Sequence, residues 1–235
     1  MRLVAERGQE EIRPDDPGSI RRMFRELAPD YDRLNSVLTF GLVHRWRRAL
    51  VRTLGAGPGG RYVDVCAGTG MSTRAVRRAA GEEAVVVGVD FTPEMLERSD
   101  GLRVLGDALR LPFPDGTFDG AISSFALRDI ADPVASLGEM ARVLRPGGRL
   151  GILEIGRPRS ALPRAGFDVW FRGAVPRVAG AFGHRRSHDF LVRSVRYLPP
   201  PEELCRELER LGLVEVGWRP LTLGAASLFV ARRGT

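Results

Sequence analysis

Lysine is absent from this sequence: all 36 basic residues are arginines, set against 29 acidic residues and three histidines. The formal net charge is +7. Such a charge permits nucleic acid, an acidic membrane surface or an anionic small molecule as partner, and it selects none of them. Because the arginines are dispersed along the chain and no recognised nucleic-acid-binding motif occurs, no nucleic acid is expected as partner, and a basic nucleic-acid-binding protein stays only as an alternative.

Cysteine is scarce, and long apolar runs are missing. Cys66 and Cys205 lie far apart and make no metal-ligand spacing, so the sequence predicts neither a disulfide nor a metal site. No window approaches the roughly 18 consecutive apolar residues of a membrane span, and the charged N-terminus has no apolar signal region. The expected location is therefore the cytoplasm, with peripheral contact to the inner face of the membrane left open.

The 235 residues are enough for one generous domain. Residues 1–18 are expected to form a flexible tail, and Ser19 to cap the first helix. Residues 19–235 are expected to form a single domain. It begins with a helical cap over 19–56, where apolar residues recur at helical spacing, and contains an inserted helical segment at 157–198.

From Tyr62 onward, short β-branched segments alternate with segments of helical periodicity. The expected strands are residues 62–66, 84–90, 102–108, 120–125, 148–155, 213–221 and 226–233, and the expected helices are 71–80, 93–99, 133–145 and 201–211. This alternation predicts a doubly wound α/β fold, with helices on both faces of a mostly parallel seven-stranded sheet. The last two strands follow one another without a helix, which predicts an antiparallel hairpin at one edge.

Three successive strand ends carry residues suited to a nucleotide-like ligand. Val63 to Gly70 runs from a strand into a small-residue turn, which lets the backbone approach a ligand closely. Asp90 follows about 20 residues later, where a carboxylate accepts hydrogen bonds from ribose hydroxyls. Asp107 ends the third strand, where it can accept from an adenine amine. Position 73 is Thr73 and not the third glycine of the dinucleotide motif, so S-adenosylmethionine is favoured over NAD.

Further motifs resemble those of the ubiquinone/menaquinone biosynthesis C-methyltransferases, a family of class I S-adenosylmethionine-dependent methyltransferases. They are Phe24-x-x-x-Ala28-Pro29-x-Tyr31-Asp32-x-Leu34-Asn35, Phe40-Gly41, Trp46-Arg47, Ser124-Phe125-Ala126-Leu127-Arg128-Asp129 and Arg142-Val143-Leu144-Arg145-Pro146-Gly147-Gly148. The resemblance implies a Rossmann-like methyltransferase fold and C-methylation of a quinol precursor such as demethylmenaquinol. A methyltransferase for another small aromatic or specialised metabolite is the alternative.

The strand ends and the resemblance together define a set of candidate cofactor-binding residues. They are Asp64, Gly68, Thr69, Gly70, Asp90, Phe91, Asp107, Ala108 and Ser124. Thr69 is expected to donate a hydrogen bond to the methionine carboxylate, because it lies at the N-terminus of a helix.

Methyl transfer from a sulfonium is an in-line displacement that depends mainly on positioning. For a ring-carbon acceptor, Arg128 is the candidate that stabilises a phenolate oxyanion, since a guanidinium keeps its proton and cannot act as a base. Asp129, Tyr31 or a water held by Asp32 is expected to receive the proton. The alternative is a purely structural ion pair between Arg128 and Asp129, a position where the family has Asn.

Segment 157–198 matches the family poorly and leaves the substrate open. Phe167, Trp170, Phe171 and Val175 form one apolar helical stripe with arginines around it. This pattern suits a helix lying on anionic lipid or covering an isoprenoid tail. It equally suits a stripe that packs on the sheet or on a second subunit of a homodimer.

Overall fold

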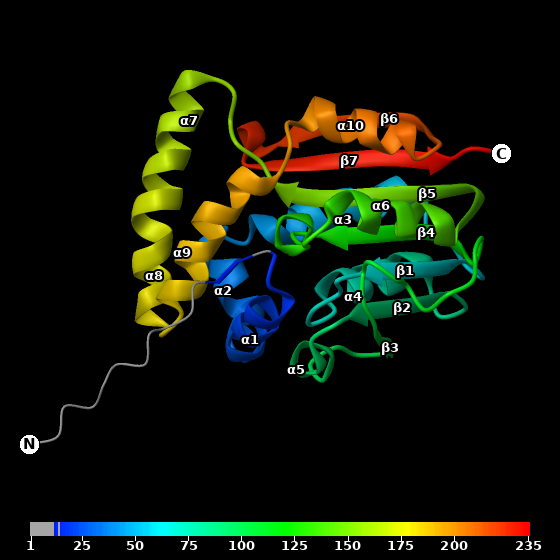
Figure 1. Ribbon diagram of the computed structural model, residues 1–235, viewed down its shortest axis with the longest axis horizontal. Helices are drawn as coiled ribbons and strands as arrows, with labels where there is room; N and C mark the ends of the chain where they lie inside the picture. The colour runs from blue at the N-terminus through cyan, green and yellow to red at the C-terminus, as the bar shows by residue number, and fades with distance from the viewer. Residues whose placement is uncertain (1–11, 14) are drawn as a thin grey trace, which may run out of the picture.

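The computed structural model describes residues 12–13 and 15–235 and contains one seven-stranded sheet (Figure 1). The strands are β1 (Arg61–Val65), β2 (Val85–Asp90), β3 (Leu102–Leu105), β4 (Phe118–Ser124), β5 (Leu144–Ile155), β6 (Leu213–Leu221) and β7 (Ala226–Arg233). Their order is β3-β2-β1-β4-β5-β7-β6, and β7 runs antiparallel to both of its neighbours. The predicted mostly parallel sheet with an antiparallel edge hairpin is confirmed.

Helices surround this sheet. The α-helices are α1 (Pro17–Leu27), α2 (Tyr31–Leu38), α3 (Leu42–Leu54), α4 (Met71–Ala80), α5 (Pro93–Leu96), α6 (Pro133–Val143), α7 (Ala161–Asp168), α8 (Val175–Ala181), α9 (Arg185–Ser194) and α10 (Pro201–Arg210). The short elements are the 3-10 turns η1 (Leu127–Asp129), η3 (Val195–Tyr197) and η4 (Thr222–Gly224), and the π-helix η2 (Val169–Ala174) that joins α7 to α8.

Two apolar layers attach helices to the sheet. Leu50 of α3 and Val76 of α4 are fully buried in one cluster with residues of β1, β2, β4, β5 and β7. Met140 of α6 and Leu204 of α10 belong to the other cluster. Each such buried side chain contributes about 1.5–3 kcal/mol to folding. Because both faces are covered, β2 is a nearly continuous run of valines, as expected for a parallel strand.

The remaining helices gather beyond the carboxyl ends of the parallel strands, where α1, α2, α8 and α9 lie together (Figure 1). Leu34 of α2 packs in a buried cluster with Phe171 and Val175, and Phe167 and Trp170 pack against it. The Trp170 Nε1 donates to the Leu38 carbonyl at 3.1 Å. The aromatic stripe of segment 157–198 therefore packs on the N-terminal cap and not, as one alternative had it, on the sheet.

The N-terminal cap differs from the prediction in two places. Helix α1 begins at Pro17, and its N-cap is Asp16, which accepts from the Gly18 amide at 3.0 Å. The prediction that Ser19 caps this helix is wrong: its hydroxyl donates instead to the carbonyls of Arg13 and Asp16. Helix α2 was not predicted as a separate helix. Most of the expected tail, residues 1–11 and 14, lies outside the described residues.

Candidate functional site

The glycine turn connects β1 to α4 and requires left-handed backbone. Cys66, Gly68 and Gly70 have φ of 58°, 56° and 79°. A Cβ on Gly70 would lie 2.2 Å from the Ser99 hydroxyl, so only glycine fits there. The turn therefore brings bare backbone to the carboxyl edge of the sheet, next to the point between β1 and β4 where the strand order reverses.

Asp90, the last residue of β2, holds this turn in place. Its two carboxylate oxygens accept from the amides of Gly68 at 2.8 Å and Thr92 at 2.9 Å. Burial raises the pKa of Asp90, against the opposing effect of these backbone hydrogen bonds. Each oxygen still has one lone pair for a further donor. A buried carboxylate with free acceptor capacity is the arrangement that a ribose diol needs.

A cavity of about 50 Å³ lies next to Asp90, and we call it the Asp90 cavity. Four of the predicted cofactor residues line it: Gly68, Asp90, Phe91 and Ser124. Its other lining residues are Ile20, Phe24, Tyr31, Cys66, Met95, Phe125, Ala126, Asp129 and Ile130. The sequence predicted no metal site or disulfide for Cys66, and no place for it in the site. Its place between β1 and the first glycine of the turn was the signal for a role in the cavity wall.

A second cavity of about 70 Å³, the Arg128 cavity, lies beside the first. It is lined by Met23, Phe24, Leu27, Tyr31, Asn35, Thr39, Val43, Trp46, Phe125, Arg128, Asp129, Ile155, Ser187, Phe190 and Leu191. Phe24, Tyr31, Phe125 and Asp129 line both cavities. Two ligands bound in the two cavities would therefore meet at these four side chains.

Arg128 lies buried between two carboxylates. Its Nη1 donates to Glu154 Oε2 at 3.0 Å, and its Nη2 lies 3.4 Å from Asp129 Oδ2. Burial lowers the pKa of Arg128, but the two carboxylates outweigh it and the pKa lies above its ordinary value. Burial likewise raises the pKa of Glu154, against the attraction of Arg128. Arg128 and Asp129 thus form the ion pair of the structural alternative, but both residues also line a cavity.

Asp129 has an unusual carboxyl group. Neither of its oxygens has a hydrogen-bond partner among the residues that the structure describes. Burial raises its pKa to about 7 against the attraction of Arg128, and the nearby Glu154 adds to the rise. The group can therefore change its protonation state near neutral pH. Burial also raises the pKa of Tyr31, which keeps that phenol protonated and makes it a poor base.

Asp32 and Thr69 connect the cap to the glycine turn. The Thr69 hydroxyl donates to Asp32 Oδ1, while Arg74 donates to Asp32 Oδ2 at 3.3 Å and to the Thr69 carbonyl at 2.8 Å. Asp32 is thus occupied by protein groups. The Thr69 hydroxyl and carbonyl are engaged in the same way, which leaves its backbone N–H for a ligand.

Four other predicted residues lie outside the Asp90 cavity. Asp64 is buried below the turn, where it accepts from the Thr73 hydroxyl at 2.7 Å, and burial raises its pKa to about 6 against that hydrogen bond. Gly70 shapes the turn. Asp107 is exposed at the edge of the sheet and accepts from the Leu109 amide at 2.9 Å, and Ala108 beside it is buried. Sequence reasoning placed these residues at the correct edge of the sheet, but the structure does not bring them into one cavity.

Arg47 of α3 was not predicted as a site residue. It is 5% exposed, and its Nε donates to Ser72 Oγ at 3.0 Å. Ser72 Oγ lies 2.9 Å from the hydroxyl of Ser124, which lines the Asp90 cavity. The Arg47 guanidinium carbon lies 5.3 Å from the Phe125 ring centroid, and burial lowers the pKa of Arg47. Its Nη1 has no hydrogen-bond partner within the described part of the chain.

Both cavities are small. Typical small-molecule sites have about 300–1,000 Å³, whereas these have about 50 and 70 Å³. Side chains from α1, α2 and α9, such as Ile20, Tyr31 and Phe190, cover them. Ligands therefore need these cap helices to shift outward, against the contacts of Asp32 with Thr69 and Arg74.

The sheet order, the glycine turn and Asp90 define a Rossmann-like fold of the methyltransferase class. A methyltransferase from Thermotoga maritima superposes with a TM-score of 0.64 at 19% identity, covering 91% of this chain and 99% of that one. A phosphoethanolamine N-methyltransferase from Haemonchus contortus, solved with S-adenosyl-L-methionine, superposes with a TM-score of 0.60 at 15% identity, covering 90% and 60%.

The sequence comparison is more specific. The model of the ubiE/COQ5 methyltransferase family matches residues 11–233, and the chain belongs to this family. The demethylmenaquinone methyltransferase of Corynebacterium kroppenstedtii is 39% identical over 221 residues, which cover 92% of this chain and 95% of that protein. The enzyme of the same name from Mycobacterium tuberculosis is 39% identical over 217 residues, covering 91% and 92%. The predicted family, fold class and enzyme class are confirmed.

Proposed function

We propose that this methyltransferase uses S-adenosylmethionine to methylate a ring carbon of a quinol precursor such as demethylmenaquinol. The observation that carries the proposal is the wall of Phe24, Tyr31, Phe125 and Asp129 between the two cavities. One cavity adjoins the glycine turn and Asp90, and the other contains Arg128. A donor and an acceptor in these cavities would meet where these four side chains line both spaces, as in-line methyl transfer requires.

The residues of the Asp90 cavity fit the cofactor. Asp90 can accept from both ribose hydroxyls, since each carboxylate oxygen keeps a lone pair. Arg47 supplies the second fit: a buried guanidinium with an unpaired donor is costly unless an anion joins it. The methionine carboxylate is such an anion, and hydrogen bonds through Ser72 connect Arg47 to Ser124 in the cavity wall. This assigns to Arg47 the carboxylate contact first expected of Thr69.

When bound, S-adenosylmethionine supplies a methyl group on a positively charged sulfur. In the acceptor cavity, Arg128 faces the quinol and stabilises the phenolate that makes the neighbouring ring carbon nucleophilic. Glu154 holds the Arg128 guanidinium through Nη1, which fixes its orientation. Asp129 lines both cavities and takes up the ring proton, because its oxygens have no hydrogen-bond partners within the described chain and its pKa lies at about 7.

A methyl-transfer assay with labelled cofactor tests this function across demethylated naphthoquinols, benzoquinols and simple phenols. Carbon methylation of the naphthoquinol, with much slower turnover of the other acceptors, is the expected result. Preferred methylation of simple phenols would support the alternative of another aromatic metabolite. Nuclear magnetic resonance of the product separates carbon from oxygen methylation, and methylation at oxygen would contradict the roles given to Arg128 and Asp129.

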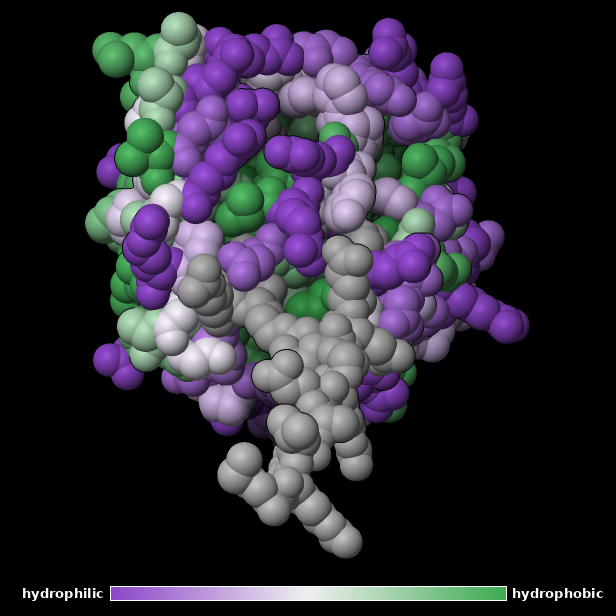
Figure 2. Space-filling model, turned by 60° about the vertical axis from the view of Figure 1, so that its left-hand side comes forward, coloured by the Kyte–Doolittle hydropathy of each residue, from purple (hydrophilic) through white to green (hydrophobic). Residues whose placement is uncertain are grey.

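The helices over residues 161–197 also suit peripheral contact with an anionic membrane. No helix of the described chain is long and apolar enough to cross a bilayer. On the side of α7 to α9, Figure 2 shows hydrophilic residues over most of the surface and hydrophobic ones in hollows between them. Leu162 and Val169 are exposed there, near Arg157 and Arg172. Co-sedimentation with anionic vesicles that weakens with salt would support this contact, and equal binding to neutral vesicles would contradict it.

A further inference from the structure

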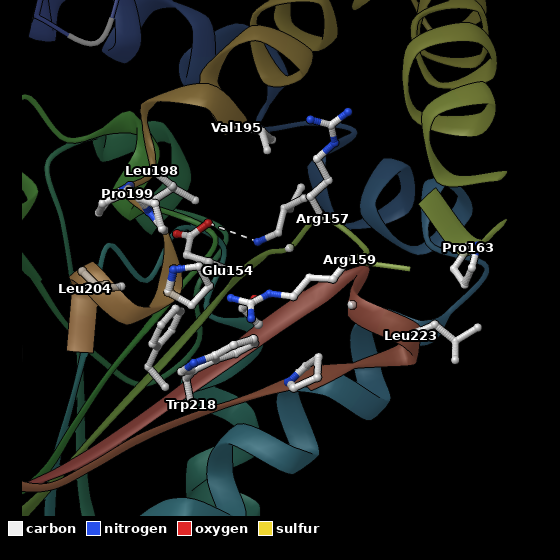
Figure 3. A pocket seen from close by; sticks show the side chains of 18 of the residues that line it. Glu154, Arg157, Arg159, Pro163, Val195, Leu198, Pro199, Leu204, Trp218 and Leu223 are labelled. Carbon is white, nitrogen blue, oxygen red and sulfur yellow. Dashed lines mark hydrogen bonds between the residues drawn. The ribbon is translucent and has the colours of Figure 1, made fainter. Parts of the chain in front are cut away.

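A third and much larger cavity lies beyond the Arg128 cavity. This Trp218 cavity has a volume of about 610 Å³ and lies between the carboxyl end of β5, the segment that leads into α10, and strands β6 and β7 (Figure 3). Figure 3 shows Glu154 at its inner end and Pro163 and Leu223 at its outer end. The volume falls in the range of small-molecule sites, unlike that of either cavity described above.

The Trp218 cavity and the Arg128 cavity are neighbours. Ile155 lines both of them. Glu154 lines the Trp218 cavity, and its carboxylate binds Arg128, which lines the other. A ligand whose ring contacts Arg128 therefore needs to pass only Ile155 to place a substituent in the larger space.

The walls of the Trp218 cavity favour an apolar substituent. Leu204 and Phe229 are buried in it, and Trp218 covers one side. Pro199, Pro200 and Pro201 form another side, and proline has no backbone N–H to donate. At the outer end, Leu223 is 78% exposed. An apolar wall thus runs from the outer end of the cavity inward, beside the charged side chains of Glu154, Arg157 and Arg159.

The charged residues of this cavity are already paired with protein groups. Arg159 binds Glu202 and lies over the Trp218 ring, 4.8 Å from its centroid. Arg157 donates to Asp168 at 3.0 Å. Glu154 accepts from Arg128 and from the Leu127 amide. Because each of these charged groups has a partner of opposite charge in the protein, none of them needs a charged group of the ligand as its counterion.

We propose that the Trp218 cavity holds the apolar isoprenoid chain of the acceptor while the quinol ring occupies the Arg128 cavity. The inference rests on the proposed function, because only a ring with a long apolar substituent would use both spaces. It also gives the chain a route to the surface at Leu223 and Pro163, next to the exposed Leu162.

The test compares two acceptors in the full-length enzyme: a demethylnaphthoquinol with an isoprenoid chain and the same ring without it. Leu198→Trp fills the cavity from a half-buried position in its wall. Leu223→Asn makes the mouth polar at a residue with φ of 57°, where Asn is tolerated. The control is Leu102→Asn, which changes an exposed leucine at the start of β3 that lines none of the three cavities.

For the chain-bearing acceptor we expect KM to rise at least tenfold with Leu198→Trp and a few-fold with Leu223→Asn. For the ring alone, kcat/KM is expected to stay within twofold, and Leu102→Asn is expected to change kcat/KM for neither acceptor. Equal losses for both acceptors, or no loss for either, would overturn the proposal. The second result would place the chain elsewhere, such as between α1 and α9.

A binding measurement separates this proposal from the proposed function. Farnesol, an isoprenoid alcohol without a quinol ring, is expected to quench tryptophan fluorescence in the wild-type protein. The quenching is expected to be lost in Trp218→Phe. In Leu198→Trp, the affinity for farnesol is expected to fall at least tenfold. If farnesol binds in this way but no quinol is methylated, the proposed function fails and the cavity assignment stands. If quinols are methylated but Trp218 does not respond, the cavity assignment fails alone.

Discussion

Replacing Arg47 with Met is expected to weaken the binding of only those cofactor analogues that carry the amino-acid part. Arg47 presents a buried Nη1 without a hydrogen-bond partner in the described chain, and its Nε is held by Ser72. S-adenosylhomocysteine has a carboxylate that can bind this donor, whereas 5′-deoxy-5′-methylthioadenosine shares the adenosine and lacks the carboxylate. Calorimetric titration of both compounds into both proteins isolates the contribution of this one contact.

The size of the effect follows from the chemistry of the contact. A hydrogen bond to a charged partner contributes about 1.5–3 kcal/mol, which corresponds to a change of about 10- to 100-fold in Kd. The buried position of Arg47 favours the upper end of that range, because little water competes for the carboxylate. Methionine is unbranched and adaptable, so it fills much of the same space without charge.

The control for this prediction is Arg48→Met on the next residue of α3, which is exposed. It is expected to leave both affinities unchanged. The reasoning would be refuted if Arg47→Met left the affinity for S-adenosylhomocysteine unchanged. It would also be refuted if both compounds lost affinity by the same factor, since Arg47 would then act only through the fold.

Three further substitutions separate the roles of the other site residues. Asp90→Ala is expected to lower the affinity for S-adenosylhomocysteine and for methylthioadenosine alike by about 100-fold, because both compounds carry the ribose. Unchanged binding in calorimetry would contradict the ribose assignment. Asp129→Asn is expected to lower kcat by about 100-fold and to remove an ionisation near pH 7 from the rate profile, and an unchanged profile would exclude Asp129 as proton acceptor. Asp32→Asn weakens the contacts with Thr69 and Arg74, so stopped-flow fluorescence is expected to show faster cofactor association and dissociation, and equal rates would mean that the cap does not limit entry.

Much of the fold followed from local pattern. The alternation of strands and helices after Tyr62 predicted the parallel sheet, because buried parallel strands need apolar side chains on both faces. The start of α1 was misplaced because Asp16 and Ser19 are both good N-caps, and only the helix geometry shows which one caps. Helix α2 was missed because it is eight residues long and follows Pro29 closely.

Of the candidate site, only the residues at the carboxyl ends of the strands could be predicted from the sequence. Gly68 lies in the turn after β1, and Asp90 and Ser124 end β2 and β4, so the meeting of three carboxyl strand ends brings them together. Arg47 and Phe24 reach the site from the cap, whose docking on the sheet depends on long-range packing that no local pattern records. Glu154, the hydrogen-bond partner of Arg128, is 26 residues away in the sequence. Only the parallel pairing of β4 and β5 places it beside Arg128.

The cluster of Arg128, Asp129 and Glu154 shows why catalysis and stability oppose each other here. Burial raises the pKa of Asp129 to about 7 against the attraction of Arg128, and the neighbouring Glu154, which shares that guanidinium, adds to the rise. In the unfolded chain the pKa of an Asp lies near 3.9. Between these values the folded protein binds the extra proton, so the stability gained from the raised pKa is present at acidic pH and is lost as pH rises through about 7. The difference corresponds to at most about 4 kcal/mol. Asn at position 129 would avoid this loss, and Asp129→Asn is therefore expected to unfold at a higher temperature than the wild type at pH 8 while it turns over more slowly. A variant that lost both activity and stability would show instead that the carboxylate serves only to hold Arg128.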